Sequence, residues 1–214
     1  MTEEWPSYHR GRRDHIHALG VIALGYSAFE RGLVTIYAHH CAQQHMPYEL
    51  VHLYYSSLNE KSQLKAIRTI FDTYEKEPAA LAFVSSLIDY FNWCSDARNT
   101  LLHSELYPTL FGGDTDKLYL TKPISRREPD STYMWLTLDE LRDIADKIEH
   151  GKRESAGFLI YLRCRDIPAD QLPVGYRAML QDPVPSPLVT PLELELSPHP
   201  EHGSMPGHLR DRKR

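Results

Sequence analysis

The residues whose types could do chemistry gather in one short stretch, "WCSDARNTLLHSELY" at positions 93–107. Arg98 and Asn99 are adjacent there, and His103 follows four residues after Asn99. An imidazole accepts and donates protons near neutral pH, and a guanidinium fork binds carboxylates and phosphates. The rest of the stretch has the apolar pattern of a buried helix. These polar residues therefore need either buried partners or a functional role.

Helical spacing divides this stretch into a polar and an apolar face. Asn92, Asp96, Asn99 and His103 step by four, three and four residues, which places them on one face of a helix. Arg98 falls in the neighbouring apolar row. Because an unpaired buried charge costs several kcal/mol, Arg98 must reach water or a carboxylate.

One acid, Glu30, lies in the first apolar run, "LGVIALGYSAFERGLVTIYA" at 19–38. This run is long enough to span a membrane, but Glu30 and Arg31 near its middle would be strongly unfavourable in lipid. We therefore expect a core helix and no membrane partner. The simplest prediction is that Glu30 pairs with Arg98. Pattern alone leaves a structural network and a functional site both open, with Glu30 and Asp96 as supporting residues.

Hydrophobic periodicity predicts a mainly α fold: an antiparallel helical bundle with a β-hairpin inserted before the last long helix. The expected helices cover about 14–45, 48–58, 62–76, 78–106 and 137–165, and the hairpin covers about 117–137. Asn59 or Ser62 would begin the third helix, and Thr137 or Asp139 would cap the last. Pro78 fits the first turn of the fourth helix, and Gly151 marks an expected interruption of the last.

This pattern divides the chain into three parts. Residues 1–13 form an N-terminal arm, residues 14–166 form one helical domain, and residues 167–214 form a Pro-rich tail. The composition of the tail is typical of an extended or disordered segment, which could lie on the domain or on a partner.

Composition narrows the function classes further. The net charge of −5 and pI of about 6.2 give no global electrostatic reason to expect nucleic-acid binding. Three cysteines, far apart in the sequence, fit reduced core thiols better than a disulfide framework. The N-terminal residues lack the pattern of a secretory signal. We therefore expect a cytoplasmic protein.

A second cluster of candidate ligands lies in "HHCAQQH", which contains His39, His40, Cys41 and His45. Cys41 and His45 are one helical turn apart and could share a metal. No second half of a zinc site with matching spacing accompanies them in the sequence. We expect a polar helix end here, with no metal and no cofactor.

The segment "RNTLLHSE" resembles a known motif. Arg98, the polar Asn99 and His103, near the end of a long predicted helix, resemble the Arg-x-x-x-x-His motif of the HEPN superfamily, the small helical domains of many prokaryotic defence and toxin ribonucleases. The segment "LGYSAFERGL" in the first helix resembles the small, aromatic and acidic pattern of some HEPN families. The order of elements is similar over about 14–164.

This resemblance implies metal-independent RNA cleavage at a composite site between two protomers. His103 would be the general base or acid on the ribose 2′-OH or the leaving 5′-oxygen. Arg98 would hold the scissile phosphate, and Asn99 would orient the imidazole or donate to the phosphate. One imidazole cannot conveniently serve both sides of an in-line displacement. The resemblance therefore implies a homodimer, whose second His103 supplies the missing role.

Two function hypotheses follow. The first is an endoribonuclease or RNA-binding protein of HEPN type, with RNA as partner, a place in defence or toxin–antitoxin systems, and an antitoxin or other protein as a further partner. The second is a non-catalytic helical module for protein interaction or dimerisation, in which the same residues form a buried polar network. A catalytic His103 would be exposed, whereas a structural one would be enclosed.

Overall fold

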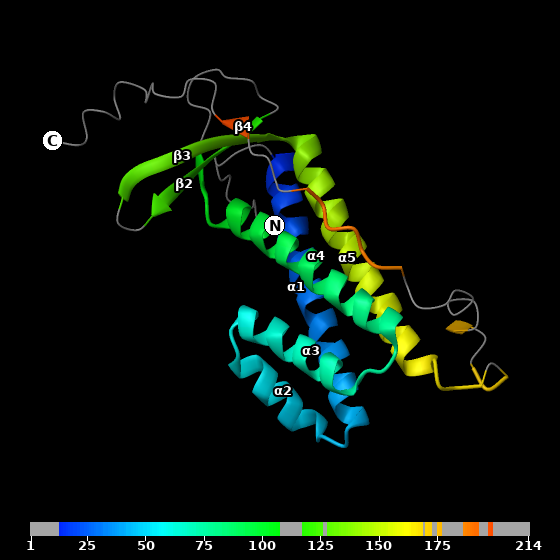
Figure 1. The fold of residues 1–214 in the computed structure, drawn as a ribbon. Coiled ribbons are helices and arrows are strands. Elements are labelled where there is room, and N and C mark those ends of the chain that lie inside the picture. Colours follow the sequence, from blue (N-terminus) through cyan, green and yellow to red (C-terminus); the bar gives the residue numbers. More distant parts are fainter. Residues whose placement is uncertain are drawn as a thin grey trace, which may run out of the picture. The chain divides into compact units, whose positions relative to one another are not determined.

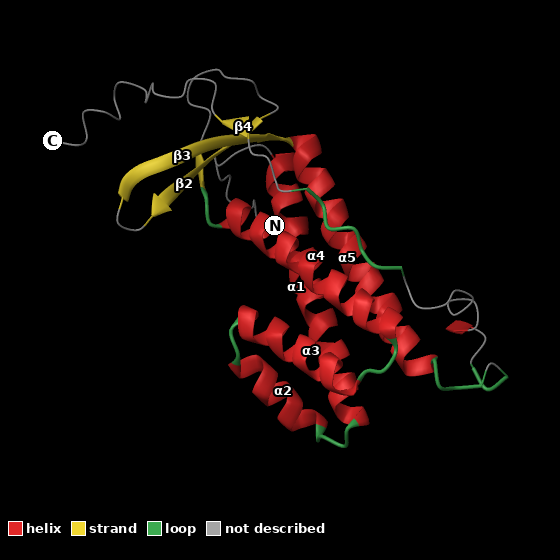
Figure 2. Ribbon diagram, in the orientation of Figure 1, coloured by secondary structure: helices red, strands yellow, loops and turns green. Residues whose placement is uncertain are grey.

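The structure, a computed structural model, describes residues 13–107, 117–125, 128–168, 170–172, 175–176, 186–192 and 197–198. Its described part is mainly helical, which confirms the predicted class (Figure 2). The helices are α1 (Arg13–Gln43), α2 (Tyr48–Ser57), α3 (Glu60–Tyr74), α4 (Pro78–Leu102) and α5 (Leu138–Cys164). The strands are β1 (Glu105–Tyr107), β2 (Lys117–Ser125), β3 (Glu128–Thr137) and β4 (Ser197–Pro198).

Local capping residues set several of the helix ends. The side chain of Asn59 accepts a hydrogen bond from the Ser62 N–H at 3.0 Å, which satisfies a free donor at the start of α3. Thr137 and Glu140 form a reciprocal capping box before α5. The Glu140 N–H donates to Thr137 Oγ1 at 3.2 Å, and the Thr137 N–H donates to Glu140 Oε2 at 2.6 Å. Thr137 is therefore the cap of α5.

The fourth helix is shorter than predicted. It ends at Leu102 rather than near Leu106, and Glu105–Tyr107 form β1. Glu105 lies opposite Thr121 of β2, so pairing with a distant strand overrides the helical periodicity of these residues.

The predicted interruption of α5 at Gly151 is wrong, because the helix is continuous through this position. A Cβ atom on Gly151 would lie 2.6 Å from Phe29 Cε1 and 2.8 Å from Tyr90 Cε1. Gly151 therefore allows two aromatic rings to approach the α5 backbone closely and does not break the helix.

Two compact units make up the chain. The first contains Met1–Gly20, Asn99–Asp143 and Leu194–Arg214, and the second contains Val21–Arg98 and Ile144–Glu193. The boundary between them falls inside α4, between Arg98 and Asn99.

The first unit contains an antiparallel sheet with strand order β1-β2-β3-β4. Figure 1 shows β2 and β3 as two long curved ribbons. Their register pairs Lys117 with Thr137 and Leu120 with Met134, and it becomes irregular between Pro123 and Ser125. The strands extend further toward their connection than the aromatic segments of the sequence indicated, because Pro123 and Glu128 also lie within them.

Helices and an aromatic core make up most of the second unit. The Phe29 and Phe91 rings meet edge to face at 5.1 Å, and the Phe83 and Phe158 rings lie 4.5 Å apart. Such aromatic pairs add to the stabilisation that comes from burying their area. In Figure 1, α2 and α3 form a helical hairpin beside the second half of α1. The Tyr37–Tyr55 ring contact at 5.0 Å joins α1 to α2.

Part of the predicted tail lies along α4. The Leu188 N–H donates to Ser86 Oγ at 2.9 Å, and Trp93 Nε1 donates to the Leu192 carbonyl at 2.8 Å. The side chains of Val189 and Leu192 are 86% and 92% exposed. Hydrogen bonds to the backbone, rather than these two side chains, hold the segment 186–192 in place.

α1 is long and apolar enough to span a membrane by length and composition, and within the described residues it is the only such helix. A core helix passes the same test. Ile22, Phe29, Leu33 and Ile36 are fully buried within the protein. Contacts inside the protein therefore account for the apolar face of α1 that these residues form.

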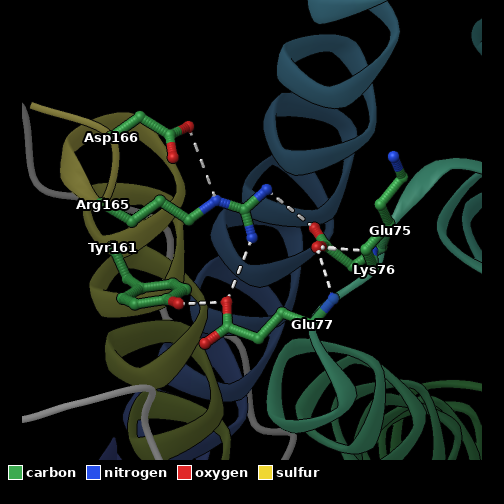
Figure 3. Close-up of polar contacts among 6 residues, drawn as sticks. All are labelled: Glu75, Lys76, Glu77, Tyr161, Arg165 and Asp166. Carbon is green, nitrogen blue, oxygen red and sulfur yellow. Dashed lines mark hydrogen bonds and ion pairs between the residues drawn. The ribbon is translucent and has the colours of Figure 1, made fainter.

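An ion-pair cluster joins the end of α5 to the segment between α3 and α4 (Figure 3). Arg165 lies between Glu75, at 2.9 Å, and Glu77, at 3.3 Å, and a longer contact of 3.9 Å reaches Asp166. The Tyr161 hydroxyl donates to Glu77. The Glu75 side chain is only 4% exposed, so its charge depends on these partners.

The pKa of Glu75 is lowered by its surroundings. Burial acts to raise it, but hydrogen bonds from the backbone N–H of Glu77 and from Arg165, together with the charge of Arg165, outweigh that effect. A lowered carboxyl pKa stabilises the fold above the ordinary carboxyl range, and this contribution is lost as the pH falls through the pKa of the folded state.

We predict that Glu75→Gln lowers the free energy of unfolding by about 1–3 kcal/mol at neutral pH. The same variant loses less stability on acidification than the wild type, because the titrating carboxylate is gone. Urea unfolding at neutral and acidic pH measures both effects. Asp139→Asn is the control, since its pair with Arg142 is 91% and 60% exposed and contributes little. Equal acid sensitivity of Glu75→Gln and wild type would contradict this role of Glu75.

Candidate functional site

The predicted polar row lies on the solvent side of α4. Asn92, Asp96 and His103 are exposed and Asn99 is half-buried. Residues of the predicted apolar row, such as Leu101, are buried. The helical spacing of the polar residues therefore separates the two faces as predicted.

Helical geometry continues through the whole motif. His103 follows the last residue of α4, and its N–H donates to the Asn99 carbonyl at 3.1 Å. The Ser104 hydroxyl donates to the Thr100 carbonyl. Asn99 and His103 therefore lie one turn apart at the end of this helix, and the imidazole is exposed to solvent.

Arg98 is half-buried and lies against an aromatic ring. Its guanidinium carbon is 5.3 Å from the centroid of the Tyr26 ring, within the range of a cation–π contact. The pairing of Arg98 with Glu30 stays a prediction, and the contact of Arg98 that the structure describes is with the Tyr26 ring of α1. Burial raises the pKa of Tyr55, and the negative charge of Glu30 adds to this increase. Glu30 therefore acts electrostatically on Tyr55 of α2.

The carboxylate that organises this region belongs to Glu60, in the first turn of α3. Tyr26 OH donates to Glu60 Oε2 at 2.9 Å, and Ser95 Oγ donates to Glu60 Oε1 at 2.6 Å. Burial raises the pKa of Tyr26 far above its usual value, and the contact with Glu60 adds to this increase. Tyr26 is therefore a neutral hydrogen-bond donor whose ring also contacts Arg98.

Sequence reasoning missed Glu60. The residue follows the Asn59 cap, so it looked like an ordinary acid in the first turn of a helix. The sequence of α4 nevertheless indicated that a hydrogen-bond acceptor lies nearby. Ser95 lies there between the buried Phe91 and Arg98. Ser95 is 2% exposed, and a hydroxyl buried among apolar residues needs a partner.

The histidine- and cysteine-rich segment near the end of α1 is packed against aromatic residues. His40 and Cys41 are buried, and the His40 ring stacks on Phe71 at 4.2 Å. Burial lowers the pKa of His40. His45 has a left-handed backbone with φ of 62°, beyond the end of the helix. Among the described residues, no group of three or more His, Cys, Asp or Glu side chains could hold a metal ion.

Two of these residues have side chains suited to chemistry. Arg98 is a cation beside an aromatic ring, and a guanidinium group can donate to an anion. His103 is an exposed imidazole at the end of the same helix, available for proton transfer with a ligand from solvent.

No family model, curated protein or solved structure matches this chain.

We predict that Glu60→Ala lowers the free energy of unfolding by about 1–3 kcal/mol, because it removes the acceptor that the Tyr26 and Ser95 hydroxyls share. Adding Tyr26→Phe to this variant should cost less than Tyr26→Phe costs in the wild type, since the shared hydrogen bond is already lost. Urea unfolding of the four proteins measures this coupling.

Glu49→Ala is the matched control for this prediction. Glu49 is also an acid in the first turn of its helix, but it is exposed. A loss of stability as large as that of Glu60→Ala would show that removal of any first-turn acid explains the effect. Additive costs of Glu60→Ala and Tyr26→Phe would also contradict the coupling.

Proposed function

We propose that this chain is a HEPN-like protein that binds RNA and cleaves it without a metal ion, using Arg98, Asn99 and His103. The observation that supports the proposal best is the exposure of His103, one turn after Asn99 at the end of α4. A histidine that only completed a buried network would be enclosed. The proposal includes the finer fold assignment, an antiparallel helical bundle with a β-hairpin inserted before its last long helix.

The proposed reaction is an in-line displacement at phosphorus. The ribose 2′-oxygen forms a bond to phosphorus while the bond from phosphorus to the 5′-oxygen breaks. The products are a 2′,3′-cyclic phosphate and a free 5′-hydroxyl. One imidazole takes the proton of the 2′-OH, and another gives a proton to the leaving oxygen. Arg98 binds the phosphate and stabilises the charge that develops on it.

The two proton transfers occur on opposite sides of the phosphate, so this mechanism requires a second imidazole. We propose that a second copy of the chain supplies its own His103, and that the active form is a homodimer. A cytoplasmic location, a role in defence or toxin–antitoxin systems, and an antitoxin or other protein partner belong to the same proposal.

One observation favours the alternative, a non-catalytic module for protein interaction. Tyr26 contacts both Arg98 and Glu60, and Glu60 also accepts from Ser95. Arg98 thus contacts a hydrogen-bonded group of side chains. The same contact would be expected if Arg98 had only a structural role. The two functions differ in their need for His103, which lies outside this group of contacts.

The deciding experiment compares the wild type with His103→Ala and Arg98→Lys on a pool of labelled RNA in the presence of EDTA. We expect wild-type cleavage to leave cyclic phosphate ends. His103→Ala should lower the rate at least about 100-fold, as loss of a general acid or base does. Arg98→Lys should also slow cleavage, because lysine keeps the charge but loses the planar fork.

His150→Ala is the matched control, since the His150 side chain is 45% exposed on α5 and pairs with Glu154. This variant should cleave as the wild type does. A wild type that neither binds nor cleaves RNA would overturn the proposal in favour of the interaction module. Equal activity of His103→Ala and wild type would remove His103 from the mechanism.

A further inference from the structure

The segment 186–192 lies on α4 as a bound peptide lies on a protein. It belongs to no helix or strand, and residues 165–185 separate it from the end of α5. In Figure 1 it is the orange stretch that runs beside the helices of the second unit. Its described contacts are two backbone hydrogen bonds and two half-buried side chains. The hydrogen bonds are made by Ser86 and Trp93, which we call the α4 site.

The α4 site offers one acceptor and one donor. The Ser86 hydroxyl donates its proton to the Phe83 carbonyl at 2.8 Å, so its oxygen is left to accept from the Leu188 N–H, at 2.9 Å. The Trp93 indole can only donate, and it donates to the Leu192 carbonyl at 2.8 Å. Both contacts therefore recognise the backbone of the segment.

The spacing of the α4 site suits an extended chain. Ser86 and Trp93 are seven positions apart on α4, which corresponds to about two turns and roughly 10 Å along the helix axis. An extended chain advances about 3 Å per residue and covers this length in three to four residues. Leu188 and Leu192, which take part in the two hydrogen bonds, are four positions apart. The segment therefore runs along α4 in the same direction as the helix.

Selection of a sequence comes from the side chains that are turned away from solvent. Leu188 and Pro191 are half-buried, whereas Val189 and Leu192 are 86% and 92% exposed. A chain in the polyproline conformation has three residues per turn, so positions three apart lie on one side of it. Leu188 and Pro191 have this spacing. The pattern that the α4 site selects is therefore Leu-x-x-Pro.

Trp93 is held in place by residues of the second unit. The Tyr90 ring lies 6.4 Å from the Trp93 ring, and Lys147 Nζ of α5 lies 5.5 Å from the centroid of the indole. The Tyr90 hydroxyl donates to the Lys147 carbonyl at 2.8 Å, which ties this group to α5. An indole fixed in this way presents its N–H at the same place, whichever chain supplies the carbonyl. Domains that bind Pro-rich peptides use aromatic surfaces of this kind.

We propose that the α4 site recognises an extended Leu-x-x-Pro segment of a partner protein, and that residues 186–192 occupy it in the free chain. A segment with few buried contacts opens at a small cost in free energy, so a second segment can replace it. The covalent link keeps residues 186–192 at an effective concentration in roughly the millimolar range. The partner must therefore bind more tightly than a free copy of this segment does.

This inference goes beyond the proposed RNA chemistry and does not depend on it. Ser86 and Trp93 take no part in the reaction proposed for Arg98, Asn99 and His103. Peptide binding and RNA cleavage are measured separately, so either proposal can fail while the other holds.

The test measures binding of a fluorescent peptide with the sequence of residues 184–194 to three full-length chains, by fluorescence anisotropy. The first is the wild type, and the second is an open chain with Leu188→Ser and Pro191→Ser. The third is the matched control with Val189→Ser and Leu192→Ser, which changes two exposed side chains instead. The open chain should bind the peptide. The wild type and the control should bind it at least about 10-fold more weakly, because their own segment competes.

Further variants test the individual contacts. Trp93→Phe in the open chain should weaken peptide binding about 5–10-fold, because the ring stays but its N–H is lost. A peptide with Leu188→Ser and Pro191→Ser should bind the open chain at least about 10-fold more weakly than the parent peptide. A peptide with Val189→Ser and Leu192→Ser should bind it as the parent does.

The proposal would be overturned if the open chain bound no peptide at concentrations up to about 1 mM, the range of the effective concentration. Residues 186–192 would then be only a structural part of the fold. Equal binding to the open chain and the wild type would also overturn it, since the peptide would bind elsewhere. Equal binding of peptides with and without Leu188 and Pro191 would contradict the selection of this pattern. The peptide variants need no change in the protein, so misfolding cannot explain their result.

Discussion

A carboxylate held between packed helices must be met by hydrogen-bond donors, and Glu60 meets this constraint with donors from two other helices. Tyr26 of α1 and Ser95 of α4 each give it a hydroxyl. Since Glu60 begins α3, this one side chain fixes three helices relative to each other within the second unit. Tyr26 extends the arrangement to Arg98 through its ring. Arg98 of the motif is thus connected, through Tyr26, to an acid that lies outside the motif.

The same unit contains a second polar cluster, in which carboxylates are paired with a cation instead of with hydroxyl groups. Arg165 is surrounded by Glu75, Glu77 and Asp166, so one cation serves several acids at the end of α5. Around Glu60, neutral hydroxyls satisfy a single acid. The first arrangement is an ion-pair cluster, whereas the second is a carboxylate that accepts from two neutral hydroxyls.

The sequence allowed the helices, their caps and the two faces of α4 to be predicted, because each depends on residues close together in the chain. Asn59, Pro78 and Thr137 act locally, and the steps of three and four residues divide polar from apolar positions. The acceptor of the Tyr26 and Ser95 hydroxyls could not be predicted in this way. Glu30 and Glu60 are both acids in helices, and only the packing of α1, α3 and α4 brings Glu60 to the two hydroxyls. The end of α4 likewise depends on pairing with a strand more than ten residues away.

The segment 186–192 is attached to α4 by its backbone, while Val189 and Leu192 point into solvent. An attachment of this kind places few demands on the exposed side chains of Val189 and Leu192, whereas Leu188 and Pro191 are half-buried. Pro187 and Pro191 suit that attachment, since proline favours extended backbone. A segment with the composition of a linker can therefore hold a defined position on the fold. Here that position depends on hydrogen bonds to Ser86 and Trp93 of α4.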